Sequence, residues 1–205
     1  MAGLRIAVFA SGQGTNFQAL ADAAQQDRLE GASLELLVCD KPEAPVVERA
    51  KRAGVDTFLF RPKEYASRED YEREILAELQ KRGIGLVVLA GYMRILTPVM
   101  VDAFAGRMIN IHPALLPAFP GVGGIKQALD YGVKVTGVTV HFVDGGMDTG
   151  PIIAQRTVEV LDGDTEATLA LRIHAVEQEV FPWVVQRIAS GAVSLDGRHV
   201  TVTTL

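Results

Sequence analysis

LRIAVFASGQGTN, residues 4–16, decides the fold that we predict for this chain. Its apolar part, residues 4–10, is typical of a buried strand, and a helix is expected to begin near Asn16. Glycines in the connecting loop let the backbone turn sharply, and free N–H groups at a helix start favour an anion. The loop lacks the Gly-Lys-Ser/Thr ending of nucleoside-triphosphate loops and the third glycine of the dinucleotide fingerprint. We therefore predict a single-phosphate site, with a plain strand-to-helix turn as the alternative; its residues are Gly12, Gln13, Gly14, Thr15 and Asn16.

The rest of the first half alternates apolar runs with amphipathic segments. The segment 67–82 has the clearest helical pattern, since Ser67 can cap its start and apolar residues recur at helical spacing after it. Alternating strands and helices predict a twisted parallel sheet with helices on both faces, which binds ligands beyond the carboxyl ends of its strands. The predicted elements are strands at 4–10, 33–40, 56–60 and 86–91, and helices from about 16, at 46–54 and at 67–82.

The second half has a different pattern. Two strand-like segments, the first with a long alternating pattern, flank a glycine-rich loop, so we expect them to pair as antiparallel strands. A long helix follows, and Pro182 is expected to kink or end it. The predicted elements are strands at 108–113, 135–144 and 151–160, a helix from near Thr165 toward Phe181, and a hairpin at Asp196-Gly197.

Length and composition argue against several classes of protein. The chain has 205 residues, which suits a single domain, 1–205, made of two tightly joined halves. Its net charge of −5 is poorly suited to gripping a nucleic-acid backbone. The single cysteine, Cys39, cannot form an internal disulfide, and no stretch approaches a membrane span. We expect a cytoplasmic protein without nucleic-acid or membrane partners, either a monomer or a weak homodimer.

Candidate catalytic residues lie in the second half. Asn110 and His112 are two apart on a predicted strand, so they point into one space, where an amide and an imidazole suit an oxyanion or a proton transfer. A carboxylate of the glycine-rich loop, Asp144 or Asp148, can meet His112 and favour its charged form. The alternatives are a core histidine beside a capping asparagine, and a polar turn. His112 and His141 have no spacing typical of a metal motif, so no metal is expected.

Taken together, these residues resemble the folate-dependent formyltransferase family. The pattern Asn-x-His followed by a distant Asp-x-Gly-Pro is specific to this group. The resemblance implies a Rossmann-like α/β fold, with a mostly parallel twisted sheet, helices on both faces and an antiparallel extension in the C-terminal half. It covers nearly the whole chain through SGQGTN (11–16), LAGYMRIL (89–96), NIHPALLP (110–117), FPG (119–121), VTVHFVD (138–144) and MDTGPII (147–153).

The resemblance also implies roles for individual residues. About 1–105 forms a nucleotide-phosphate-binding half, in which a Cβ at Gly14 is expected to crowd the phosphate. About 106–205 forms the catalytic and folate-binding half. Two departures are the loop 122–125, where some relatives carry His, and His174, which replaces a Gln. The implied catalytic residues are Asn110, His112 and Asp148; the nucleotide contacts are Gly14, Thr15, Asn16, Arg68 and Glu177; the folate contacts are Met93, Arg94, Ile95, Leu96, Val101, Met108, Val143 and Asp144.

The implied reaction moves the formyl group of 10-formyltetrahydrofolate to the amine of glycinamide ribonucleotide, a step of de novo purine biosynthesis. The amine would attack the formyl carbon directly and form a tetrahedral intermediate, which Asn110 and His112 would stabilise while Asp148 orients His112. No metal is required. The alternatives are a formyltetrahydrofolate deformylase, another member of the family, or a non-catalytic nucleotide-binding module.

Overall fold

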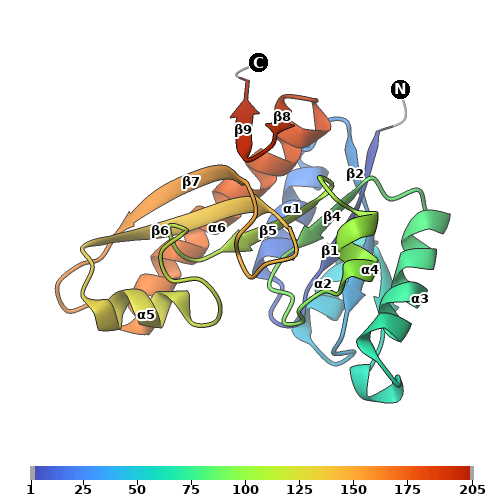
Figure 1. The fold of residues 1–205 in the computed structure, drawn as a ribbon, viewed down its shortest axis with the longest axis horizontal. Helices are drawn as coiled ribbons and strands as arrows, with labels where there is room; N and C mark the ends of the chain where they lie inside the picture. The colour runs from blue at the N-terminus through green and yellow to red at the C-terminus, as the bar shows by residue number, and fades with distance from the viewer. Residues whose placement is uncertain (1–2, 204–205) are drawn as a thin grey trace.

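The computed structural model describes residues 3–203, which form a mixed seven-stranded sheet, helices and a small separate hairpin (Figure 1). In chain order the elements are β1 (Leu4–Phe9), α1 (Thr15–Gln25), β2 (Ala32–Cys39), α2 (Pro45–Ala53), β3 (Asp56–Leu59), a 3-10 turn (Pro62–Glu64), α3 (Arg68–Lys81), β4 (Leu86–Leu89), α4 (Pro98–Ala103), β5 (Met108–His112), α5 (Gly124–Tyr131), β6 (Val135–Phe142), β7 (Ile152–Glu159), α6 (Glu166–Ala189), β8 (Val193–Asp196) and β9 (His199–Val202).

The strands of the main sheet lie in the order β3-β2-β1-β4-β5-β6-β7. The first five are parallel, whereas β6 runs antiparallel to β5 and β7 antiparallel to β6. The predicted parallel sheet and its antiparallel extension are therefore confirmed. The predicted hairpin is confirmed as β8 and β9, which pair through Asp196 and His199 around a two-residue turn.

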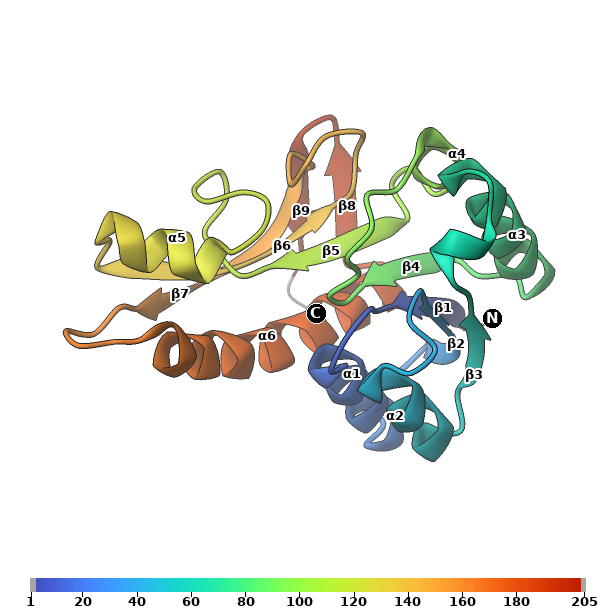
Figure 2. The same ribbon diagram turned by 90° about the horizontal axis from the view of Figure 1, so that it is seen from below.

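Helices cover both faces of the sheet (Figure 2). On β1, Ile6 and Val8 point into one core, which also contains residues of α1, α2 and α6. Ala7 and Phe9 point into the other core, which contains residues of α3 and α4. This alternation follows from the two-residue period of a strand, and it explains why the strands read as continuous apolar runs.

The chain changes direction in the sheet between β1 and β4, so the loops that follow these two strands meet there. The buried Ser11 joins them, because its backbone N–H donates to Gly91 O at 3.1 Å and its hydroxyl accepts from the Met93 N–H at 2.9 Å. A crevice beyond the strand ends at such a point is where open α/β sheets bind ligands.

Three helical features differ from the sequence analysis or were absent from it. Pro182 does not end α6, which continues to Ala189; buried residues on both sides of the proline, such as Phe181 and Val184, offset the missing hydrogen bond. The short helix α4 begins behind the Thr97 cap, and α5 begins behind a left-handed Gly123; both are too short to give a periodic signal. None of the helices within residues 3–203 is both long and apolar enough to cross a membrane.

Gly14 is fixed by packing between the first loop and α2. Its φ is +72°, which favours glycine, and a Cβ built on it would lie 2.4 Å from Val46 Cγ2. The expectation that this Cβ would crowd a phosphate is therefore wrong, because it points into α2.

Gly14→Ala is expected to lower the free energy of unfolding by about 3 kcal/mol, since it adds backbone strain to a steric clash. Gly12→Ala is the matched control, because a Cβ at Gly12 meets nothing within 4 Å. We expect the control to change stability by less than about 1 kcal/mol. Urea unfolding of both variants measures the difference, and equal losses would contradict this account of Gly14.

Candidate active site

The antiparallel pairing of β5 and β6 brings three polar side chains together. Asn110 and His112 lie two apart on β5, and the register places His141 of β6 directly opposite Asn110. Asn110 Nδ2 is 3.3 Å from His141 Nε2. Both histidines are buried, so their ring nitrogens depend on neighbouring protein groups for hydrogen bonds.

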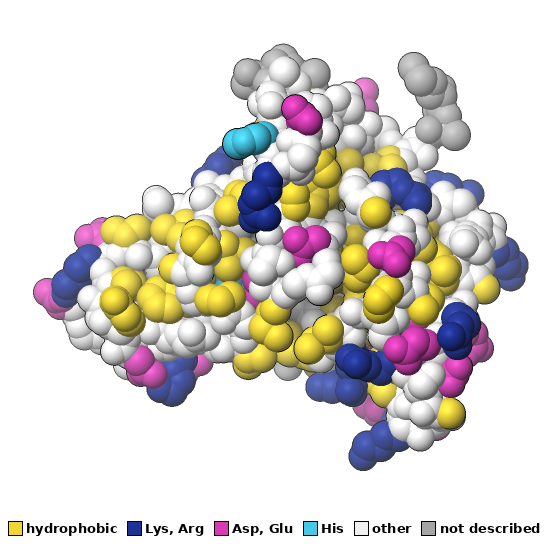
Figure 3. Space-filling model, in the orientation of Figure 1, with side chains coloured by type: hydrophobic (Ala, Val, Ile, Leu, Met, Phe, Trp, Pro, Cys, Tyr) yellow, Lys and Arg dark blue, Asp and Glu magenta, His cyan; other side chains and the backbone are white. Residues whose placement is uncertain are grey.

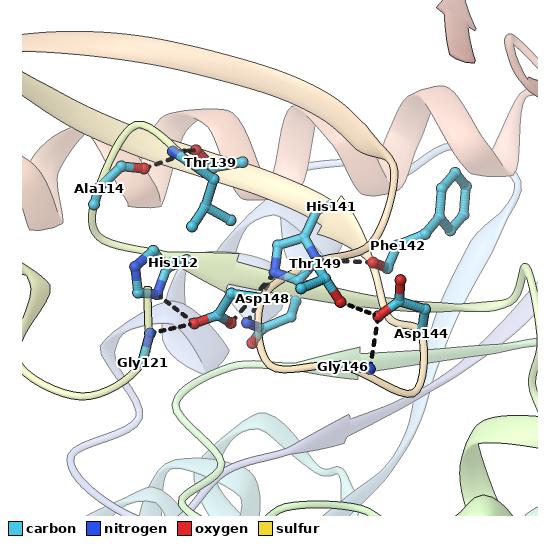
Figure 4. A network of polar contacts seen from close by, with 12 residues as sticks. His112, Ala114, Gly121, Thr139, His141, Phe142, Asp144, Gly146, Asp148 and Thr149 are labelled. Carbon is cyan, nitrogen blue, oxygen red and sulfur yellow. Dashed lines mark hydrogen bonds and ion pairs between the residues drawn. The ribbon is translucent and has the colours of Figure 1, made fainter. Parts of the chain in front are cut away.

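Asp148, in the loop between β6 and β7, lies between the two histidines (Figure 4). Its Oδ2 is 3.4 Å from His112 Nδ1, and its Oδ1 is 3.6 Å from His141 Nε2. The Gly121 N–H donates to Oδ2 at 2.7 Å. The contact with His141 lowers the pKa of Asp148, and the Gly121 N–H and the charge of His112 add to this, against the opposing effect of burial. Asp148 is therefore ionised at neutral pH.

The ring of His112 has an acceptor at each nitrogen. Nε2 is 2.7 Å from the Phe119 carbonyl oxygen, and Nδ1 faces the Asp148 carboxylate. Only a ring that carries both protons can donate to both acceptors. Of the two carboxylates that the sequence analysis left open, Asp148 is the one beside His112, whereas Asp144 accepts from Gly146 and Thr149 of its own loop. Asp148 is thus placed to orient His112.

His141 is the residue of this cluster that the sequence analysis missed, because it was weighed only as a metal ligand. Its Nδ1 donates to the carbonyl of Phe142 at 2.7 Å, and its Nε2 lies between Asn110 Nδ2, at 3.3 Å, and Asp148 Oδ1, at 3.6 Å. An available signal was the two-residue spacing of Thr139 and His141, which puts both polar side chains on one face of the predicted strand 135–144. Within residues 3–203, no three His, Cys, Asp or Glu side chains are grouped so as to hold a metal ion.

A cavity of about 190 Å³ opens beside Asn110, His141 and Asp148. Its walls combine apolar side chains, among them the exposed Ile95 and Met147, with several polar ones. Apolar side chains also gather near the centre of the face shown in Figure 3. A pocket that combines apolar walls with convergent polar groups suits a small organic ligand. The lining residues are Leu89, Tyr92, Arg94, Ile95, Leu96, Val101, Asn110, His141, Val143 and the loop 144–148.

The structure places most of the predicted folate contacts on this cavity, but not all of them. Met108 is 1% exposed and belongs to the core beneath the sheet, and Met93, 66% exposed, does not line the cavity. Arg94 lines it while its Nε donates to Asp40 at 2.7 Å. The N–H of Val143 already donates to Met108 O, so this group is not free for a ligand. The predicted contacts that do line the cavity are Arg94, Ile95, Leu96, Val101, Val143 and Asp144.

The predicted phosphate loop, residues 12–16, is held in place by hydrogen bonds from α2. Val46 N–H donates to Gly12 O at 3.2 Å, and Arg49 Nε donates to Gln13 O at 2.7 Å. Because C=O and N–H point in opposite directions across a trans peptide, these contacts direct the following N–H groups away from α2. The α1 helix starts at Thr15, and amides of a first turn have no acceptor within their helix. The geometry thus leaves a set of N–H groups that can donate to an anion.

Two predicted nucleotide contacts lie in different places. Glu177 of α6 meets this loop, because Asn16 Nδ2 donates to its Oε2 at 3.1 Å. Arg68, at the start of α3, lies instead beside the cavity, with Nη1 3.5 Å from Ile95 O. The structure therefore groups Glu177 with residues 12–16 and does not bring Arg68 to them.

Comparison with known proteins gives a consistent result. The formyl transferase family matches residues 4–185. Phosphoribosylglycinamide formyltransferase of Bacillus subtilis is 46% identical over 184 residues, which cover 90% of this chain and 94% of that protein. The crystal structure of glycinamide ribonucleotide transformylase 1 from Symbiobacterium toebii superposes with a TM-score of 0.96 at 44% identity, over 99% of this chain and 95% of that one. The protein of the same name from Geobacillus kaustophilus gives a TM-score of 0.89 at 53% identity, over 91% and 99%.

The buried Glu177 generates a prediction about stability. Burial raises its pKa, despite the hydrogen bond from Asn16 and the charge of His174. Above the ordinary carboxyl pKa the unfolded chain has lost this proton while the folded chain still holds it, so rising pH destabilises the fold. Glu177→Gln removes that penalty. The free energy of unfolding of this variant, measured in urea, should rise relative to that of the wild type between pH 4 and pH 8. Parallel plots of unfolding free energy against pH for the two proteins would contradict the burial effect.

Proposed function

Since the chain belongs to the formyl transferase family, we propose that it transfers the formyl group of 10-formyltetrahydrofolate to the amine of glycinamide ribonucleotide, a step of purine biosynthesis. The observation that carries this proposal is the Asp148 carboxylate, held between two histidines beside Asn110 at one end of an apolar cavity. The reaction is a direct acyl transfer, in which the amine attacks the formyl carbon and a tetrahedral oxyanion forms.

Asn110, His112 and Asp148 carry the chemistry. The Asn110 amide nitrogen has two hydrogens; one is directed at His141, and the other remains for the oxyanion in the cavity that Asn110 lines. Asp148 lies beside Nδ1 of His112, which leaves Nε2 as the nitrogen that would donate to the substrate, although His112 does not itself line the cavity. In the structure Nε2 contacts the Phe119 carbonyl oxygen. The formyl oxygen must replace that carbonyl oxygen before His112 can polarise the formyl group. Asp148 then assists the transfer of a proton from the attacking amine to the leaving folate nitrogen.

The two substrates occupy opposite sides of this cluster. The folate ring lies in the 190 Å³ cavity, between the apolar side chains of Leu96 and Val101 and the loop 144–148. The phosphate of the nucleotide binds the N–H groups of residues 12–16, and Glu177 accepts from a ribose hydroxyl. Arg68, beside Ile95, contacts the acceptor from the cavity side. These two regions meet through Ser11, which bonds to both Gly91 and Met93.

We place this activity in the cytoplasm. The support is the thiol of Cys39, which is free and buried, and whose pKa is raised by that burial. Proteins of a reducing compartment keep their cysteines as free thiols.

The acceptor of the formyl group distinguishes this reaction from that of a deformylase, which uses water, and from that of a family member that formylates methionyl-tRNA. Purified protein is mixed with 10-formyltetrahydrofolate, and loss of the formyl group is followed with glycinamide ribonucleotide, with methionyl-tRNA and with no amine at all. We expect rapid transfer only to glycinamide ribonucleotide, because the predicted phosphate loop, residues 12–16, suits a ligand with one phosphate. Rapid loss of formyl to water would make the protein a deformylase, and a requirement for charged tRNA would overturn the proposed acceptor.

Asp148→Asn tests the role of the carboxylate. The amide keeps the size of the side chain but removes its charge, so it no longer stabilises a protonated His112. Turnover should fall about 10²-fold or more, the magnitude expected for a lost acid–base group. Affinity for both substrates, measured by calorimetry, should change little. Turnover close to that of the wild type would contradict the assignment.

A further inference from the structure

Asp148 has a backbone conformation that is uncommon for a residue other than glycine. Its φ is +54°, in the left-handed region, which Asp adopts more readily than most residues with a side chain but which still carries backbone strain. The same conformation aims the carboxylate at His112 and His141. Contacts from three parts of the chain restrain the segment around Asp148.

Two restraints come from the loop and the strands that carry it. Thr149 Oγ1 donates to Asp144 Oδ1 at 2.6 Å, and the Gly146 N–H donates to the same oxygen at 3.0 Å. Gly150 is packed against β6 so closely that a Cβ would lie 1.7 Å from Phe142 O. These contacts fix the side chain of Thr149 and the backbone of Gly150, but they leave the Thr149 carbonyl open to another donor.

The third restraint comes from the C-terminal hairpin, which is separate from the main sheet. Arg198, in the turn between β8 and β9, donates from Nη2 to Thr149 O at 2.8 Å. The hairpin is placed for this contact because β9 packs against β7, the strand that follows the loop (Figure 1). Arg198 is exposed and makes no salt bridge among the ion pairs of residues 3–203, so surface charge pairing does not explain its position.

We propose that Arg198 is a positioning residue for formyl transfer: by holding the Thr149 carbonyl, it keeps Asp148 directed at the two histidines. This inference rests on the proposed function. The Thr149 carbonyl belongs to the peptide that joins Thr149 to Gly150, and Gly150 is already fixed against Phe142. Fixing the carbonyl as well leaves the chain between Asp148 and Gly150 little freedom to rotate. Without Arg198 the segment can relax toward negative φ at Asp148, which moves the carboxylate away from His112.

A double-mutant cycle tests this inference. Arg198→Met keeps the length and apolar stem of the side chain but removes the donor, and we expect it to slow turnover about five- to tenfold, the size of one lost hydrogen bond. The Michaelis constant for the nucleotide should change less than about twofold. In the Asp148→Asn background the same substitution should slow turnover less than about twofold, because Arg198 then has no carboxylate to position.

Two further variants complete the design. Arg198→Lys keeps a cationic donor and should recover most of the lost turnover. His199→Ala changes the neighbouring exposed residue of the hairpin and should leave turnover unchanged, with all melting temperatures within a few degrees of the wild type.

The outcomes separate the two proposals. A wild-type protein that transfers no formyl group to the ribonucleotide would overturn the proposed function itself. If the wild type is active, turnover unaffected by Arg198→Met would overturn the positioning role. An equal loss with Asp148 intact and in the Asp148→Asn background would do the same, since an additive effect does not pass through the carboxylate.

Discussion

One carboxylate shared by two histidines is the constraint on which the rest of the site depends. Asp148 reaches His112 of β5 and His141 of β6, and this is possible because β6 reverses the direction of the sheet. The reversal places His141 opposite Asn110 and lets the following loop fold over both strands. The antiparallel extension of an otherwise parallel sheet is thus what assembles the cluster, and the loops after β1 and β4 supply the predicted phosphate loop and one wall of the cavity.

The electrostatics of the cluster follow from its partial burial. A carboxylate removed from water would hold its proton more strongly, yet contacts with His141, the Gly121 N–H and His112 lower the pKa of Asp148. Glu177 shows the opposite balance, because one hydrogen bond from Asn16 does not offset its burial, and its pKa is raised. The partly buried Asp148 and the buried Glu177 therefore differ in their tendency to carry a charge. The lowered pKa of Asp148 suits a carboxylate that faces histidine rings. The raised pKa of Glu177 suits a carboxyl group that forms a hydrogen bond with a neutral hydroxyl.

The sequence predicted the features that depend on local periodicity, and it missed those that depend on contacts between distant segments. The strand and helix alternation, the Ser67 cap and the placement of Asn110 beside His112 all follow from spacings of a few residues. Met108 was misplaced because a strand residue next to a site can point into the core instead. Pro182 is tolerated within α6 because packing, which has no local signature, outweighs its effect.

The clearest limit of sequence reasoning is the backbone itself. Asp148 lies in left-handed conformation, a fact that no side-chain pattern reveals, since a Gly-rich loop usually assigns such angles to glycine. Several groups hold it there, and most of them act through main-chain atoms: the Gly121 N–H, the Thr149 carbonyl and the close approach of Gly150 to Phe142. A contact made through backbone atoms is compatible with many residue types. The residues that make such contacts therefore leave little recognisable pattern in the sequence. A carboxylate in a strained backbone conformation is therefore recognised from the structure, by asking which contacts prevent it from relaxing.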